Sequence, residues 1–169
     1  MPVALRPLRA DDWEAVYGWA SLIEVCRYQP WGPNTAQQTR EFVELTAQEW
    51  ETEPQQNFPY VILVDGAVSG LATLHMRPFR QGEITYSLHP DHWGRGIATE
   101  AAGELLRLGF AGHGLHRIYG TCDPRNIASG KVMRKLGMVH EGRLRQNVLI
   151  RDGWRDSDVY SILETEWAR

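Results

Sequence analysis

Two glycines, Gly94 and Gly96, stand directly before a segment whose apolar spacing predicts a long amphipathic helix. The first amides of a helix have no acceptor within the helix, and together with the helix dipole they form an anion site. Glycine lets a bulky anion come close to such a backbone. The helix face expected to dock on a sheet carries Ile97, Ala101, Leu105 and Leu108. Phosphate is therefore the natural ligand, and a simple tight turn between strand and helix is the alternative.

Two familiar phosphate-binding motifs do not fit this chain. A dinucleotide fingerprint, GxGxxG, needs a third glycine where Thr99 stands, and the preceding strand belongs to a predicted meander rather than a βαβ unit. A P-loop, GxxxxGK[ST], fails because Val132 follows Gly130-Lys131 and Arg125 occupies the first glycine position. The turn at residues 94–96 therefore needs another interpretation.

Three polar residues elsewhere have types and positions suited to group transfer. Glu83 opens a predicted strand in which alternation places it on the same face as Thr85 and Ser87. Asn126 and Ser129 lie three residues apart at the start of a predicted short helix, and so near one face. Each also has a plain structural interpretation: a carboxylate at a strand end, a helix N-cap and a first-turn serine.

Metal and redox sites have little support in the sequence. His89 and His92 have HxxH spacing, but Pro90 and the following turn exclude the helix that such a metal pair needs. Cys26 and Cys122 stand far apart without CxxC spacing, which favours buried free thiols. We therefore expect no metal.

The elements that must position these residues form a mixed α/β pattern. The predicted order is β-α-α-β-β-β-α-β-α-β-β, with about seven mostly antiparallel strands flanked by about four helices. Three β-rich runs, FPYVILV, VSGLATLHM and EITYSLH, are joined by a turn at Asp65-Gly66 and by a turn containing Gly82. A closing hairpin turns at residues 151–153. No linker is long enough to divide the chain, so we expect a single domain over residues 1–169.

Between the first strand and this meander, a second helix is predicted over residues 37–51. The segment SLIEVCRYQPWGPNT before it contains Pro30, Gly32 and Pro33, so it is predicted to lack regular structure. Its large aromatic side chains make it a candidate binding loop.

Charge and hydropathy restrict the possible partners. The 169 residues carry 18 Lys and Arg against 21 Asp and Glu, a net charge of −3. This balance argues against nucleic acid or an anionic membrane as the main partner. No signal peptide or membrane span is evident, so a soluble cytoplasmic protein is expected. A Trp-rich exposed surface would permit a homodimer.

The segment WGRGIATEA after EITYSLHPD resembles the acyl-CoA pyrophosphate loop, [Q/R]xxGx[G/A], of the GNAT superfamily of N-acyltransferases. Gly96 and Ala98 match this pattern, whereas Trp93 stands where most members have Gln or Arg. Tryptophan there is familiar in the branch resembling the ribosomal-protein N-terminal acetyltransferases (RimJ/RimL-like). NIASGKVMRKLGM and EGRLRQNVLIRDGWRDSDVYSIL are also similar to segments of that branch.

The resemblance implies a GNAT-like fold, acetyl-CoA as cosubstrate and transfer of the acetyl group to a primary amine, of a protein N-terminus or a small molecule. It implies that the pyrophosphate is held by amides of Gly94, Arg95, Gly96, Ala98 and Thr99. It places pantetheine contacts at Leu88 and Asn126. Ser129 would protonate or solvate the thiolate, and Glu83 would be the general base.

On the acceptor side, the resemblance implies that Tyr28, Trp31 and Trp154 wall the amine site, with Glu83 facing it. A backbone amide near Leu88 would stabilise the oxyanion where two strands splay apart. The ribosomal-protein enzymes are expected to carry a base carboxylate where this chain has the run 146–148, which is Gln-Asn-Val. That departure leaves a non-catalytic acyl-CoA-binding or regulatory module as the alternative function.

Overall fold

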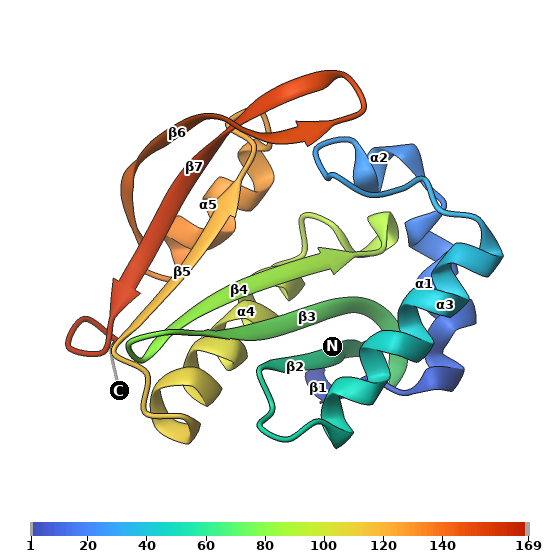
Figure 1. Cartoon of the computed structure of the whole chain (residues 1–169), viewed down its shortest axis with the longest axis horizontal. Coiled ribbons are helices and arrows are strands. Elements are labelled where there is room, and N and C mark those ends of the chain that lie inside the picture. Colours follow the sequence, from blue (N-terminus) through green and yellow to red (C-terminus); the bar gives the residue numbers. More distant parts are fainter. Residues whose placement is uncertain (1, 168–169) are drawn as a thin grey trace.

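A single twisted sheet, with helices on both of its faces, forms the centre of the protein (Figure 1). The computed structural model describes residues 2–167. The strands are β1 (Val3–Pro7), β2 (Asn57–Val64), β3 (Ala67–Arg77), β4 (Gln81–Leu88), β5 (Arg117–Cys122), β6 (Val139–Ile150) and β7 (Gly153–Leu163). The α-helices are α1 (Trp13–Ala20), α2 (Ile23–Cys26), α3 (Ala36–Ala47), α4 (Ile97–Arg107) and α5 (Ile127–Lys135). This element order confirms the predicted mixed α/β fold.

The strand order in the sheet is β1-β2-β3-β4-β5-β7-β6, and every neighbouring pair is antiparallel except β4 with β5. The parallel pair is short: it ends at Glu83 opposite Tyr119. Beyond that point β4 continues to Leu88 and β5 to Cys122 without pairing with each other, and Figure 1 shows the two strands diverging. The splay that the resemblance implied is therefore present, and it exposes backbone groups of two central strands.

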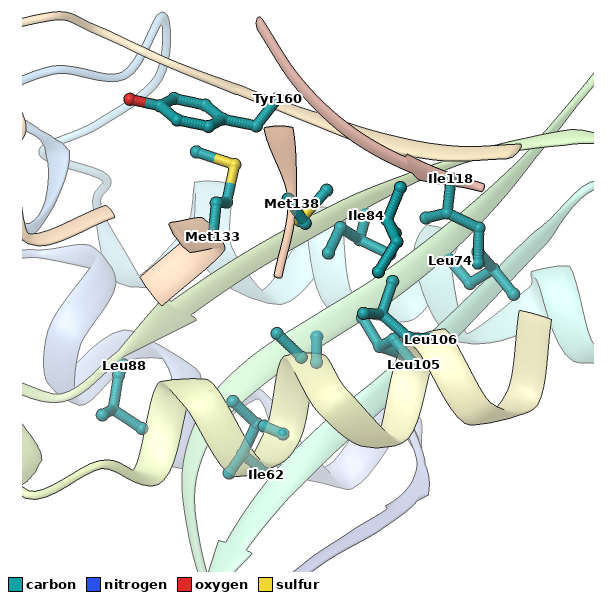
Figure 2. Packing of buried hydrophobic residues seen from close by; sticks show 14 of the residues in the cluster. Ile62, Leu74, Ile84, Leu88, Leu105, Leu106, Ile118, Met133, Met138 and Tyr160 are labelled. Carbon is teal, nitrogen blue, oxygen red and sulfur yellow. The ribbon is translucent and has the colours of Figure 1, made fainter. Parts of the chain in front are cut away.

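Each face of the sheet has its own apolar core. One core packs α4 against the sheet through side chains such as Ile84, Leu88, Leu105 and Ile118 (Figure 2). The other packs α1 and α3 against the opposite face through Trp19 and neighbouring side chains. The alternation of apolar residues in β2 and β3 serves both cores, because successive side chains point to opposite faces. Helix α4 is thereby held with its N-terminus at the open end of the splay (Figure 1).

Three local predictions differ from the structure. The segment after α1 was expected to lack regular structure, but it contains the short helix α2. Gly82 does not lie in a turn: it lies within β4, and the turn spans residues 78–80. A Cβ at Gly82 would approach Leu115 Cδ1 to 2.6 Å, so this glycine is needed for close packing. Leu108 begins a π-helical segment (Leu108–Gly112), and Leu106 is buried in its place.

Candidate active site

The turn between β4 and α4 presents backbone amides to an open surface. Gly94 and Gly96 have φ values of +73° and +83°, in the left-handed region that favours glycine. A Cβ at either position would meet nothing within 4 Å, so packing does not explain these glycines. Among the described residues, the amides of Gly94, Gly96 and Ala98 have no backbone acceptor. The geometry is that of an anion cradle at a helix N-terminus.

Thr99 takes a different place in this turn. Its N–H donates to the carbonyl of Gly96 at 3.0 Å, as does the N–H of Glu100. These two bonds close the first turn of α4 and orient the amides before them. The Thr99 amide is therefore already engaged, unlike the amides of Gly94, Gly96 and Ala98.

Trp93 links the glycine turn to strand β4 through a hydrogen bond. Its indole N–H donates to the carbonyl oxygen of Leu88, the last residue of β4, at 2.9 Å. This bond ties the turn to the end of the splayed strand, at the residue where a pantetheine contact was expected, and it uses one lone pair of that residue's carbonyl oxygen. The departure of Trp93 from the [Q/R] position thus has a structural role.

Two cavities meet in the splay between β4 and β5. One, of about 570 Å³, is lined by the glycine turn, by the start of α4 and by α5. The other, of about 640 Å³, lies among residues of α1, α3, β3 and β4. The residues common to both cavities are Gln29, Tyr86, Ser87, Asn126 and Ser129. A ligand in one cavity can therefore meet a ligand in the other at the start of α5.

At this junction Tyr86 and Ser129 form a polar pair. The Tyr86 hydroxyl donates to the carbonyl of Ser129 at 3.2 Å and lies 3.1 Å from Ser129 Oγ. Burial raises the pKa of Tyr86, so its phenol stays protonated at neutral pH. Asn126 is the N-cap of α5 and accepts the Ser129 N–H at 3.2 Å. Its plain structural interpretation is thus correct, and its amide group still lines both cavities.

Glu83 is the last residue of β4 that pairs with β5, and it lines the larger cavity. Its Oε2 accepts from Arg77 Nη2 at 2.6 Å and from the Tyr119 hydroxyl at 3.2 Å. All three hydrogen bonds to this carboxylate use Oε2, so Oε1 has no partner among the described residues. The carboxylate is held in place and keeps one oxygen for a ligand or a water molecule.

The three aromatic residues expected to line the amine site lie in different places. Trp31 lines the larger cavity with Glu83, whereas Tyr28 lines the smaller one, where Arg125 stacks over its ring at 5.4 Å. Trp154 lines neither cavity and is 62% exposed. Arg151, at the turn of the β6–β7 hairpin, donates to the carbonyls of Cys26, Trp31 and Gly32. The hairpin therefore holds the loop that carries Trp31.

The smaller cavity is also strongly basic. Besides Arg27 and Arg125, it is lined by Lys131 and Lys135, the only two lysines of the whole chain. They lie four residues apart on α5, and so on one face. Their charges suit the phosphate groups of a nucleotide.

Between residues 2 and 167, no group of three His, Cys, Asp or Glu residues could hold a metal ion.

Comparison with known families agrees with this geometry. The family model described as "Acetyltransferase (GNAT) domain" matches residues 3–139. The chain belongs to the GNAT acetyltransferase family. It is 33% identical to the uncharacterized N-acetyltransferase YnaD of Bacillus subtilis over 96% of this chain and 94% of that protein. It is 30% identical to the spermidine N(1)-acetyltransferase of Escherichia coli, over 98% of this chain and 88% of that one.

A solved structure supports the RimJ-like branch of the GNAT family. RimJ of Mycobacterium smegmatis in complex with CoA-disulfide superposes with a TM-score of 0.80, at 28% identity, covering 99% of this chain and 84% of that one. The predicted family and branch are thus confirmed, the chain is a GNAT N-acetyltransferase, and the cosubstrate of this family is acetyl-CoA. In the described residues no helix is long and apolar enough to cross a membrane.

Within this GNAT fold, several residues that line the two cavities were not among the site residues expected from the sequence. In the sequence, Lys131 belongs only to the P-loop pattern that does not fit, and Lys135 belongs to no phosphate-binding motif. Their shared helix face was readable from their spacing. From the sequence, Tyr86, Tyr119 and Tyr160 are most simply core or sheet aromatics, although any one of them could serve as the thiolate acid; the splay brings the hydroxyl of Tyr86 to Ser129. Arg155 of β7, which lines the larger cavity, carried no signal in the sequence.

The two lysines give a testable prediction for this GNAT protein. Replacing Lys131 or Lys135 by Ala should weaken acetyl-CoA binding about three- to tenfold in low salt, because each removes a cation from the cavity. The loss should shrink as salt is raised, since ions screen exposed charges. Calorimetric titration at two salt concentrations measures both effects. The exposed Arg145→Ala, outside both cavities, is the control and should bind normally; an equal loss there would contradict the assignment.

Proposed function

We propose that this protein transfers an acetyl group directly from acetyl-CoA to a primary amine within a ternary complex. The observation that carries the proposal is the meeting of two cavities at Tyr86 and Ser129, between the splayed strands. The basic cavity with the glycine turn would take the CoA moiety. The larger cavity, with Glu83 in its lining, would take the amine.

The amine must lose a proton before it can attack the thioester. At pH 7 this costs about 1 kcal/mol for an α-amine and about 4.6 kcal/mol for a lysine side chain, given their ordinary pKa values. Glu83, with Oε1 available, would accept this proton directly or through a water molecule. A protein N-terminus or another amine of low pKa therefore makes the smallest demand on this base.

Attack on the thioester creates an oxyanion, and its collapse releases a thiolate. Backbone amides of β4 beyond Glu83 have no partner strand on the side of β5, so they are placed to stabilise the oxyanion. Ser129, bonded to the protonated Tyr86, would donate to the departing sulfur. This pair supplies the acid that the reaction needs at its last step.

The neighbouring cysteine supports direct transfer over a covalent intermediate. Cys122 lines the larger cavity close to Ser129. Burial raises the pKa of its thiol to about 11, so it is protonated at neutral pH. A protonated thiol is a weak nucleophile, and the amine is the better acceptor of the acetyl group.

The Tyr86–Ser129 pair makes a second prediction. Ser129→Ala and Tyr86→Phe should each lower kcat about tenfold, because either change interrupts proton donation to the thiolate. The double variant should lose far less than the product of the two single losses, since both groups act through one hydrogen bond. Steady-state thiol release measures all three. Tyr60→Phe, outside both cavities, is the control; additive losses in the double variant would contradict a joint role.

The proposed function is tested by following free thiol from acetyl-CoA with three classes of amine: a peptide with a free N-terminus, spermidine and small aromatic amines. We expect amine-dependent thiol release with at least one class, accompanied by a mass gain of one acetyl group on the amine. CoA binding without turnover of any amine would instead support the non-catalytic module. Thiol release without an acetylated amine would show hydrolysis.

A further inference from the structure

The larger cavity contains a buried arginine that forms no ion pair with a carboxylate among the described residues. Arg155 of β7 is 9% exposed and lines this cavity but not the smaller one. Its Nη1 donates to Ser157 Oγ at 2.8 Å and to the carbonyl of Asp156 at 3.1 Å. Its Nε is buried and has no hydrogen-bond partner among the described residues. Both partners of Nη1 are neutral oxygens, so the guanidinium keeps a full positive charge to be compensated.

Asp123, the carboxylate whose negative charge acts on Arg155, is already paired with another arginine. Asp123, whose side chain is 1% exposed, accepts from Arg125 Nη2 at 2.7 Å and from Arg125 Nε at 3.0 Å. Asp158 accepts from Arg143 Nε at 2.7 Å. Between residues 2 and 167, no carboxylate forms an ion pair with Arg155. A buried cation without a counter-ion is unfavourable unless a ligand supplies one.

The topology explains how this arginine reaches the cavity. The last residue of β5 paired with β7 is Cys122, opposite Asp158. Arg155 lies on the part of β7 beyond that pair, where β5 has ended and β7 pairs with β6 alone, Arg155 opposite Val148. It is thus placed at the same open end of the sheet where β4 and β5 diverge.

We propose that Arg155 binds a carboxylate of the acceptor, so that the amine substrate is a small zwitterion such as an amino acid. This inference rests on the proposed function. The charged residues in the lining of this cavity are Glu83, Asp123 and Arg155, and Asp123 is already paired with Arg125. Glu83 and Arg155 therefore remain to bind an ammonium and a carboxylate on one molecule. The planar guanidinium favours a carboxylate, since two parallel N–H donors match its two oxygens. A polyamine, which carries only positive charge, would instead meet the repulsion of Arg155.

The test uses protein saturated with desulfo-CoA and a panel of L-amino acids, each paired with its carboxamide. Calorimetry should show at least one acid binding about tenfold or more tightly than its amide. Arg155→Met should abolish the difference between acid and amide, while Arg155→Lys should keep part of it. Arg145→Met, an exposed arginine of the same hairpin, should leave it unchanged. Thermal unfolding shows whether the Met variant folds. If it does not, the difference in affinity between acid and amide, measured for the Lys variant and for the wild-type protein, still tests the inference.

The inference is overturned if acids and amides bind alike, if no acid binds, or if the Met variant keeps the discrimination. Thiol release assays separate it from the proposed function. Turnover of spermidine as fast as that of any amino acid would overturn the inference and leave acetyl transfer intact. Binding of an acid without turnover of any amine would support Arg155 and refute the catalytic proposal alone.

Discussion

Glu83→Gln is expected to lower kcat for amine-dependent thiol release about a hundredfold, while acetyl-CoA affinity stays within about twofold. The amide is nearly isosteric with the carboxylate but cannot accept a proton from the amine. Because Glu83 lines only the larger cavity, the CoA moiety does not depend on it. Steady-state kinetics and calorimetric titration of desulfo-CoA measure the two effects separately.

The control for this variant is Arg77→Gln. The Arg77–Glu83 ion pair, at 2.6 Å, is broken by either change, but only the Glu83 variant removes the carboxylate. Arg77 lines neither cavity and its side chain is 40% exposed. We therefore expect kcat of Arg77→Gln to fall no more than about threefold, as for an exposed ion pair. Equal losses in the two variants would show that the ion pair matters and that Glu83 is not the base.

Gly96→Val is expected to weaken desulfo-CoA binding about thirtyfold. A β-branched residue is strained at a φ of +83°, by about 2 kcal/mol, and relief of that strain would move the amides of the turn away from their common focus. The side chain itself would meet nothing in the free protein, so the loss of affinity reports on the ligand cradle. Calorimetric titration measures it directly.

Gly66→Val provides a matched control for this prediction. Gly66 has a φ of +85° in the turn between β2 and β3, and a Cβ there also meets nothing within 4 Å. It should lose a similar amount of stability in thermal unfolding but bind desulfo-CoA normally. If both valine variants lost affinity equally, general destabilisation would explain the result and the turn would have no special role.

Much of the fold was predictable because its signals are local. Alternation in residues 57–88 predicted the meander, and the apolar spacing after Gly96 predicted α4. The order of the strands in the sheet was not predictable in the same way. Nothing local indicates that β7 inserts between β5 and β6, or that β4 and β5 pair only as far as Glu83. These pairings depend on contacts between distant segments.

The candidate site also has one part that local sequence predicts and one part that depends on distant segments. The phosphate turn was predictable because glycine conformation and unpaired helix amides are properties of a few consecutive residues. The larger cavity draws its lining from α1, α3, β4 and β7, so its members share no sequence neighbourhood. In the sequence Arg155 is an ordinary charged residue of a hairpin, and only the structure shows that it is buried in the lining of the larger cavity. The resemblance implied that the Thr99 amide binds pyrophosphate, and only the structure shows that this amide donates to the carbonyl of Gly96.

The central claim is that the amides between β4 and α4 hold the pyrophosphate of CoA. The most direct measurement is a titration of ¹⁵N-labelled protein with desulfo-CoA, followed by two-dimensional NMR. We expect the amide signals of Gly94, Gly96 and Ala98 to move most, and the signal of Gly66 not to move. Saturable binding with these three signals unmoved would contradict the claim.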